Sequence, residues 1–166
     1  MKSFKFMSLM LTLTACTTIF TACSKDDDKN EGASVTMEQL AGTWEMTHIS
    51  GWCYDENDEG ELFKNTINMD VNEATLREFM EKDVADYCRY KFTADGQFNN
   101  YVYADGTWRQ DSPVVPYTLN GSTITINPKS KDEEQLTVLS ISATQIVMRE
   151  YDPEEFDLTI TCKKID

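Results

Sequence analysis

His48 is the only histidine in the chain, so it is the first residue to test for acid–base or metal chemistry. A nucleophilic triad places a histidine between a nucleophile and a carboxylate, and the sequence offers no identifiable partner for His48 in such a triad. No second histidine or exposed pair of cysteines is present to complete a zinc site. The carboxylates are too numerous for two of them to be singled out as a glycosidase pair. We therefore expect no enzymatic activity, no metal and no cofactor.

The acidic run at residues 55–60, Asp-Glu-Asn-Asp-Glu-Gly, is the second candidate for chemistry. Oxygen-bearing side chains at alternate positions followed by a glycine match the first half of a calcium-binding loop. The twelfth position of such a loop holds a bidentate glutamate, and here it is Thr66. We therefore predict a solvated loop, with calcium binding as the alternative.

Cys23 follows a segment that is typical of a secretory signal. Lys2 and Lys5 form a short basic start, and residues 6–22 are mostly apolar or small and carry no charge. The apolar run is short and rich in threonine, which argues against a membrane span. Two small residues directly precede Cys23, as cleavage at that point requires.

These residues resemble the lipobox of bacterial lipoproteins, with Phe20 in the place of the usual leucine. The resemblance implies that Cys23 becomes the first residue after cleavage and is acylated on its sulfur and its amino group. More than one acyl chain is what stable membrane anchoring requires. Cys16 matches the lipobox letters more closely, but cleavage there would leave a hydrophobic segment of only about ten residues. We predict that residues 1–22 are the signal peptide; lipidation at Cys16 and plain secretion are the alternatives.

The run from Ser24 to Asp28, Ser-Lys-Asp-Asp-Asp, resembles the acidic export signal of surface lipoproteins of the Bacteroidota. The resemblance implies a lipid-anchored outer-membrane protein that faces the cell exterior; a periplasm-facing anchor is the alternative. Charged runs of this kind also make solvated linkers. We predict a flexible acidic tether over residues 23–36 and one folded domain over residues 37–166.

The charge of the chain limits the partners that it can have. The formal net charge is −14, and because the predicted signal carries two lysines and no acid, its removal would leave −16. A chain this acidic repels nucleic acid and has no basic stripe to offset the repulsion. The expected partners are the membrane, through the lipid anchor, and a small-molecule ligand, with an outer-membrane protein as the alternative.

The first part of the domain predicts one strand and one helix. Residues 42–49 alternate as a strand, with Trp44, Met46 and His48 on one face. Residues 71–87 carry apolar side chains at helical spacing and predict a helix. This helix is inserted between the first and second strands.

From residue 88 onward the sequence predicts short strands separated by turns, of which the Asn-Gly pair at 120–121 is the strongest signal. The expected strands are 88–92, 98–103, 107–109, 117–119, 123–127, 135–141, 145–151 and 156–162. Strands at this spacing predict an all-β fold, an antiparallel meander barrel of eight to nine strands. A two-sheet sandwich is the alternative.

Several of these strand and turn signals are similar to those of lipocalins and lipocalin-like bacterial domains. The similar motifs are Leu40-x-Gly42-x-Trp44, Phe92-x-x-Asp95-Gly96-x-Phe98, Gly106-x-Trp108 and Tyr117-x-Leu119-x-Gly121-x-x-Ile124-x-Ile126. The resemblance covers about residues 37–163, and the inserted helix departs from the plainest members of the family. It implies a small barrel that binds an apolar or amphipathic molecule or serves as an interaction module, with Trp44 packed at one barrel end.

The predicted domain contains Cys53, Cys88 and Cys162, in a compartment that permits disulfides. In a meander, the end of the first strand meets the start of the second, which brings Cys53 close to Cys88. The end of the last strand then lies at the opposite pole, near Thr43. We therefore predict a Cys53–Cys88 disulfide and a buried Cys162; three unbridged thiols are the alternative.

Counting in steps of two along the strands places Tyr90, Phe92 and Tyr117 in the barrel interior, with His48 nearer one end. We predict a surface-anchored lipoprotein that binds a small apolar or aromatic ligand there through these four residues, with the helix of 71–87 covering that end. The chain is rich in aromatic residues, which we predict to fill the core; any of them that face the barrel mouth could instead stack on a sugar or another flat molecule. They are Tyr87, Tyr90, Tyr101, Tyr103, Trp108 and Tyr117. The alternative is a non-enzymatic protein-interaction module, or an accessory subunit of an outer-membrane complex, with a filled barrel. A barrel filled by its own side chains would exclude an internal ligand.

Overall fold

The computed structural model describes residues 35–56, 60–82 and 85–166. The predicted signal peptide, the predicted lipidation site Cys23, the predicted tether up to residue 34 and the centre of the acidic loop lie outside the described residues. Within the described part, no helix is long and apolar enough to cross a membrane.

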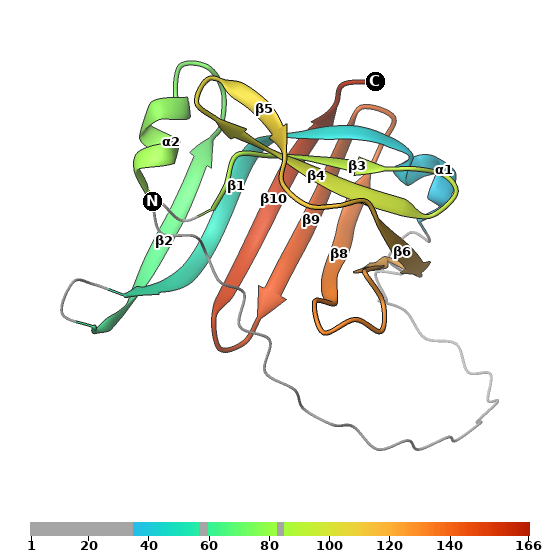
Figure 1. Ribbon diagram of the computed structural model, residues 1–166. Helices are drawn as coiled ribbons and strands as arrows, with labels where there is room; N and C mark the ends of the chain where they lie inside the picture. Colours follow the sequence, from blue (N-terminus) through green and yellow to red (C-terminus); the bar gives the residue numbers. More distant parts are fainter. Residues whose placement is uncertain (1–34, 57–59, 83–84) are drawn as a thin grey trace, which may run out of the picture. The chain divides into compact units, whose positions relative to one another are not determined.

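The described residues form one antiparallel sheet whose ends meet to close a barrel (Figure 1). Its strands are β1 (Gly42–Glu56), β2 (Leu62–Asp70), β3 (Cys88–Phe92), β4 (Gln97–Ala104), β5 (Thr107–Gln110), β6 (Val115–Asn120), β7 (Thr123–Ile126), β8 (Glu134–Ile141), β9 (Gln145–Asp152) and β10 (Phe156–Lys164). Eight of these described strands follow one another around the barrel in the order β1-β3-β4-β6-β7-β8-β9-β10, and β10 pairs back onto β1. The predicted all-β meander barrel is therefore confirmed.

The long strand β1 shares one of its edges between two partners. Its first residues, Gly42 to Glu45, pair with β3, and its remainder, from His48 to Glu56, pairs with β2. On its other edge β1 pairs with β10 over most of its length. As a result β2 lies beside the barrel rather than within the closed ring, and it was not predicted from the sequence.

The helix α2 (Leu76–Lys82) connects β2 to β3 and is shorter than the predicted helix of 71–87. A turn replaces the predicted first part of the helix. The Asn72 side chain accepts a hydrogen bond from the Ala74 backbone N–H at 2.9 Å, and the Thr75 hydroxyl donates to the Asp70 carbonyl at 2.6 Å. These local bonds compete with helical ones and delay the start of α2.

The short helix α1 (Met37–Leu40) covers one end of the barrel. It begins with a capping box in which Thr36 and Gln39 exchange side-chain and backbone hydrogen bonds. Leu40 and Trp44 are fully buried, and the Trp44 indole N–H donates to the Leu40 carbonyl at 2.7 Å. The expectation that Trp44 packs at a barrel end is therefore confirmed.

Side chains from all around the barrel fill its interior. The inward-facing residues that are at most 5 % exposed include Trp44, Met46, Ile49, Cys53, Phe92, Phe98, Tyr117, Ile124, Ile126, Leu136, Val138, Ile146, Met148, Leu158, Ile160 and Cys162. Tyr90, Val115, Leu119 and Phe156 are partly buried and pack against them. These side chains pack on one another, as the core of a small barrel does.

The predicted inward position of His48 is wrong because β1 contains a bulge. Met46 pairs with Cys162 and His48 pairs with Thr161, the next residue back along β10. Thr47 is therefore the extra residue of a β-bulge. The extra residue reverses the alternation beyond it. Ile49 is consequently fully buried, and the His48 side chain turns to the outer wall, where it is 34 % exposed.

The predicted Cys53–Cys88 disulfide is contradicted by the strand pairing. Cys53 lies opposite Asn65 of β2 and Phe156 of β10, because β2 occupies the place that the prediction gave to β3. Cys88 precedes Arg89, the partner of Glu45, and therefore lies near the start of β1, on the order of 20 Å from Cys53 along the strand. All three described cysteines are buried and none forms a disulfide, and burial raises the pKa values of Cys88 and Cys162.

Candidate functional site

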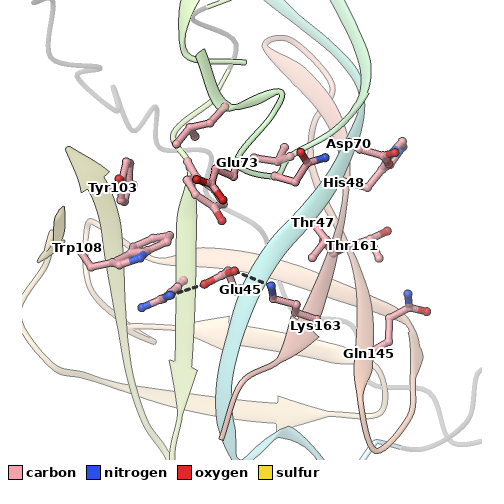
Figure 2. A pocket seen from close by; sticks show the side chains of 15 residues that line it. Glu45, Thr47, His48, Asp70, Glu73, Tyr103, Trp108, Gln145, Thr161 and Lys163 are labelled. Atoms are coloured by element: carbon pink, nitrogen blue, oxygen red, sulfur yellow. Dashed lines mark hydrogen bonds and ion pairs between the residues drawn. The ribbon is translucent and has the colours of Figure 1, made fainter. Parts of the chain in front are cut away.

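A pocket of about 830 Å³ lies on the outer wall of the barrel (Figure 2). Its floor residues Glu45 and Lys163 lie opposite each other and alternate along their strands with the buried Trp44, Met46 and Cys162. Since successive side chains of a strand point to opposite faces, the floor of the pocket is the outside of the wall whose inner side is the core. The pocket is thus separated from the barrel interior by the backbone of β1, β3 and β10.

Three charged residues from three neighbouring strands make up the centre of the floor. Glu45 lies across from Arg89 of β3 on one side and from Lys163 of β10 on the other. The Arg89 Nε donates to Glu45 Oε2 at 2.7 Å, and Lys163 Nζ lies 2.9 Å from Glu45 Oε1. Burial by itself would raise the pKa of Glu45, but hydrogen bonds from Lys163 and Arg89 and their positive charges outweigh burial and lower it. Glu45 is therefore a carboxylate held by two cations.

Aromatic rings form one side of the pocket. The Tyr87 ring lies 4.8 Å from Trp108 and 5.8 Å from Tyr103, measured between ring centroids. The Arg89 guanidinium lies 3.9 Å from the centroid of Trp108, within cation–π distance. Burial, together with the neighbouring Glu45, raises the pKa of Tyr87 to about 12. Phe79 of α2 packs edge-on against Tyr87, with 6.4 Å between the centroids, so the inserted helix supports this wall.

The end of β2 and the turn before α2 form the opposite side. His48 Nδ1 lies 2.8 Å from Asp70 Oδ1, which joins the two strands at the rim. The Val71 N–H donates to the Thr47 carbonyl at 2.8 Å, and the Val71 side chain is buried. Figure 2 shows His48 and Asp70 on the opposite side of the pocket from Tyr103 and Trp108. The bulge at Thr47 thus turns His48 into the pocket wall.

The remaining floor carries uncharged polar side chains. Thr47, Thr161 and Gln145 line it, and the Thr47 hydroxyl donates to the Thr161 carbonyl at 3.1 Å. Together with the Glu45 cluster they offer hydrogen-bond donors and acceptors beside aromatic rings. Among residues 35–56, 60–82 and 85–166, no three His, Cys, Asp or Glu side chains are grouped as metal ligands. This arrangement is suited to holding a molecule by hydrogen bonds and ring contacts.

The structure does not bring the four predicted ligand residues together. His48 lines the pocket, but Phe92 and Tyr117 are at most 3 % exposed and pack on each other in the core, with 5.3 Å between ring centroids. Tyr90 stacks against Phe98 on the same inner side. Three of the four predicted ligand residues therefore belong to the core, and only His48 lines the pocket.

The pocket residues that sequence reasoning missed are Glu45, Arg89 and Lys163, whereas Tyr87 and Trp108 were counted only among the aromatic residues predicted to fill the core. In the sequence, Glu45 and Lys163 are each adjacent to an inward-facing residue. Solvated charged residues on the outside of a barrel show the same pattern, so the pattern does not identify a pocket. The signal that could have found them is their pairing: an acid on β1 with a base directly opposite on each neighbouring strand. That signal becomes visible only once the register is known.

An acidic side chain of β9 points into the barrel. Glu150 of β9 lies opposite Leu136 and Leu158, two buried residues, and so shares their inner face. Burial, with a smaller contribution from the charge of Glu134, raises the pKa of Glu150 to about 7. Glu150 is therefore a group whose protonation state changes near neutral pH.

A closed eight-stranded antiparallel barrel whose first strand begins with Gly42-x-Trp44, with the tryptophan buried against a short helix, has the architecture of a lipocalin-type domain. A family model described as lipocalin-like domain matches residues 40–148, more than half of the chain. The chain belongs to this lipocalin-like family. A comparison with curated proteins found no match.

Proposed function

We propose that this protein is a lipid-anchored, non-enzymatic binding protein of the outer-membrane surface. Its lipocalin-like domain holds a small ligand with a flat ring and hydrogen-bonding substituents in the outer pocket. One observation carries the proposal: the pocket places a hydrogen-bonded charge cluster beside an aromatic wall, on the outside of a barrel that is filled by its own side chains. Concave sites with apolar walls and a few convergent polar groups are where proteins bind small molecules.

The location of the pocket changes the class of ligand that we expect. An apolar ligand in the barrel mouth would need room among side chains such as Phe92 and Tyr117, which pack on each other. The outer pocket has Glu45, Arg89 and Lys163 at its floor, and a purely apolar ligand would leave their hydrogen-bonding capacity unused. A ligand with a ring and polar substituents fits both surfaces.

The anchoring part of the proposal rests on the sequence of residues 1–28. The uncharged apolar segment, the small residues before Cys23 and the acidic run after it support lipidation and export to the cell surface. Substituting Cys23→Ser should release the protein from the membrane fraction and abolish labelling by radioactive palmitate. Cys16→Ser is the matched control and should leave both unchanged. Loss of labelling in the control alone would move the anchor to Cys16.

Protein binding is the second candidate function. Tyr54, Leu62 and Phe63, on the β1–β2 hairpin, are between 44 and 72 % exposed. Exposed aromatic and aliphatic residues close together are typical of interaction surfaces. Crosslinking on intact cells, with and without substitution of Phe63 by Ser, would test this function without reference to the pocket.

Ligand-observed NMR with the purified chain tests small-ligand binding. The panel consists of monosaccharides, nucleosides and aromatic carboxylic acids. At least one class should bind, and binding should weaken at least tenfold in Trp108→Ala and in Lys163→Ala. Leu139→Ala is the control, because Leu139 is 52 % exposed and does not line the pocket. Binding that both pocket variants leave unchanged, or no binding to any class, would contradict the proposal.

A further inference from the structure

The pocket is continuous with a longer face on the outside of the barrel. Beyond the bulge, the outward residues of β1 are His48, Ser50, Trp52 and Tyr54, and His48 lines the pocket. Alternate residues of a strand are about 7 Å apart, so this row extends about 20 Å from the pocket. The row lies between β10 and β2, which supply the neighbouring outward side chains.

The middle of this face is flat and polar. Ser50 lies opposite Thr159 of β10 and Asn68 of β2, and His48 lies opposite Thr161. These neighbours are short side chains with hydroxyl or amide groups, and none of them is buried. The middle of the face therefore offers hydrogen bonds and little apolar surface.

The far end of the face is aromatic. The Trp52 and Tyr54 rings meet edge-on, with 5.4 Å between their centroids, and Tyr54 is 44 % exposed. Tyr151 of β9 is 52 % exposed and lies in the same row as Trp52, with Asp157 between them. The Lys64 ammonium lies 4.1 Å from the Trp52 centroid.

The charges at the far end are balanced. Arg149 forms two hydrogen bonds to the Asp157 carboxylate, at 2.7 and 2.9 Å, and its guanidinium lies 4.5 Å from the centroid of Tyr151. The hydrogen bond from Arg149 lowers the pKa of Asp157 and outweighs the opposing effect of burial, so the pair is ionised at neutral pH. The far end therefore repeats the chemistry of the pocket, in which a cation lies against an aromatic ring and is paired with a carboxylate.

We propose that the pocket and this face together bind one neutral oligosaccharide chain, which lies along β1 from Trp108 to Tyr54. A sugar ring has C–H faces that pack on aromatic rings and hydroxyls that pair with amide, hydroxyl, carboxylate and guanidinium groups. A chain of such rings matches a face with aromatic rings at both ends and a polar middle. This inference rests on the proposed function, because it takes the pocket as one end of the site.

Charge and composition favour a neutral glycan over other polymers. The net charge of −14 opposes binding of nucleic acid and of acidic polysaccharides. A protein partner would gain most from a continuous apolar surface, whereas Thr159, Ser50 and Asn68 separate the two aromatic ends. A neutral sugar chain is not repelled by the negative charge and does not require a continuous apolar surface.

Isothermal titration calorimetry with neutral oligosaccharides of one to six rings tests this inference. The probes are gluco-, manno- and galacto-oligosaccharides, and the protein is the purified full chain in detergent. In at least one series, affinity should rise at least tenfold between one ring and the longest chain. Trp52→Ala and Tyr54→Ala should remove that gain without changing the affinity for a single ring, whereas Trp108→Ala should weaken both.

The outcomes separate the two proposals. If affinity does not depend on chain length, or if both Trp52→Ala and Tyr54→Ala keep the gain, the extended face is wrong while the pocket stands. If Trp108→Ala leaves binding unchanged, the proposed pocket itself is wrong. If no oligosaccharide series binds, the proposed saccharide class of ligand is wrong. In that case, an outer-membrane protein that binds the wild-type chain but not the Trp52→Ala variant would assign the face to a protein partner. Thermal melts and Leu139→Ala exclude loss of folding as the cause.

Discussion

Glu45 and Lys163 face each other across the β1–β10 pairing that closes the barrel, with Glu45 Oε1 2.9 Å from Lys163 Nζ. The same pair lies in the floor of the outer pocket. Closure of the barrel and formation of the pocket therefore depend on one register. A shift of β10 by one residue against β1 would move Lys163 to the inner face and the core residues of β10 to the surface.

Replacing Glu45 by Gln should destabilise the fold by about 1–3 kcal/mol at pH 7, because Arg89 and Lys163 would lose the carboxylate between them. Since the folded-state pKa of Glu45 is lowered, its stabilising effect is present above the ordinary pKa of 4.5 and is lost as the pH falls through the folded-state value. The difference between variant and wild type should shrink accordingly in acid. Urea denaturation at several pH values measures it. Glu154→Gln, at an exposed position, is the control, and equal stability of the two variants at pH 7 would refute the role given to Glu45.

Glu150 should make the barrel less stable as the pH rises. Below the ordinary pKa of 4.5 the Glu150 carboxyl is protonated in both folded and unfolded chains, so its ionisation does not lower the free energy of unfolding. As the pH rises from 4.5 through about 7, the unfolded chain ionises while the folded chain holds its proton, so stability falls by up to about 3 kcal/mol in total. Glu150→Gln should therefore equal wild type at pH 4 and exceed it at pH 8 in urea denaturation. A variant that is less stable than wild type at pH 8 would contradict the inward, unfavourable position.

The three described cysteines should stay reduced in the folded protein. A peptide map made without reductant should contain no linked pair of the Cys53 and Cys88 peptides, because β2 separates these residues. Cys88 and Cys162 should react with iodoacetamide only after unfolding, because burial raises their pKa values and limits access. Recovery of a Cys53–Cys88 peptide would overturn the pairing of β1 with β2.

Deletion of Thr47 should leave the barrel folded but less stable. Without the extra residue, Met46 and His48 keep Cys162 and Thr161 as their partners, so His48 stays outward and Ile49 stays buried, but the Val71 N–H loses the Thr47 carbonyl as its acceptor. Thr47→Ala keeps the residue count, loses only the hydroxyl contact to Thr161, and should cost less than about 1 kcal/mol. Circular dichroism and thermal melts compare the two. A deletion variant that fails to fold would contradict the assignment of Thr47 as the extra residue of the bulge.

Local pattern was enough to predict the barrel but not its irregularities. From β3 to β10, alternation and turn residues such as Asn120-Gly121 carry the signal, because each strand has one face on the core. The bulge at Thr47 leaves no mark in the sequence, since the residues on either side of it still look like a strand. β2 was missed because only Ile67 is buried along its length, so its pattern is mostly polar.

The pocket could not be predicted because long-range pairing creates it. Glu45, Arg89 and Lys163 come from strands far apart in the sequence, and each alone is typical of a solvated barrel surface. Trp108 and Tyr87 were recognised as aromatic but not as neighbours, because β5 pairs with β4 and Tyr87 precedes β3. The inserted helix was expected to cover a barrel end, and instead it supports the aromatic wall through Phe79.

The indole N–H signals of the three tryptophans report on three separate places. Trp44 lies in the core under α1, Trp108 in the pocket wall, and Trp52 at the far end of the outer face. Two-dimensional NMR of the ¹⁵N-labelled chain during titration with the neutral oligosaccharides is the most direct test of binding on the outer wall. We predict that the Trp108 signal shifts first, that Trp52 shifts only with the longer chains, and that Trp44 stays in place. A shift of Trp44 with Trp108 unchanged would place the ligand inside the barrel and contradict the outer site.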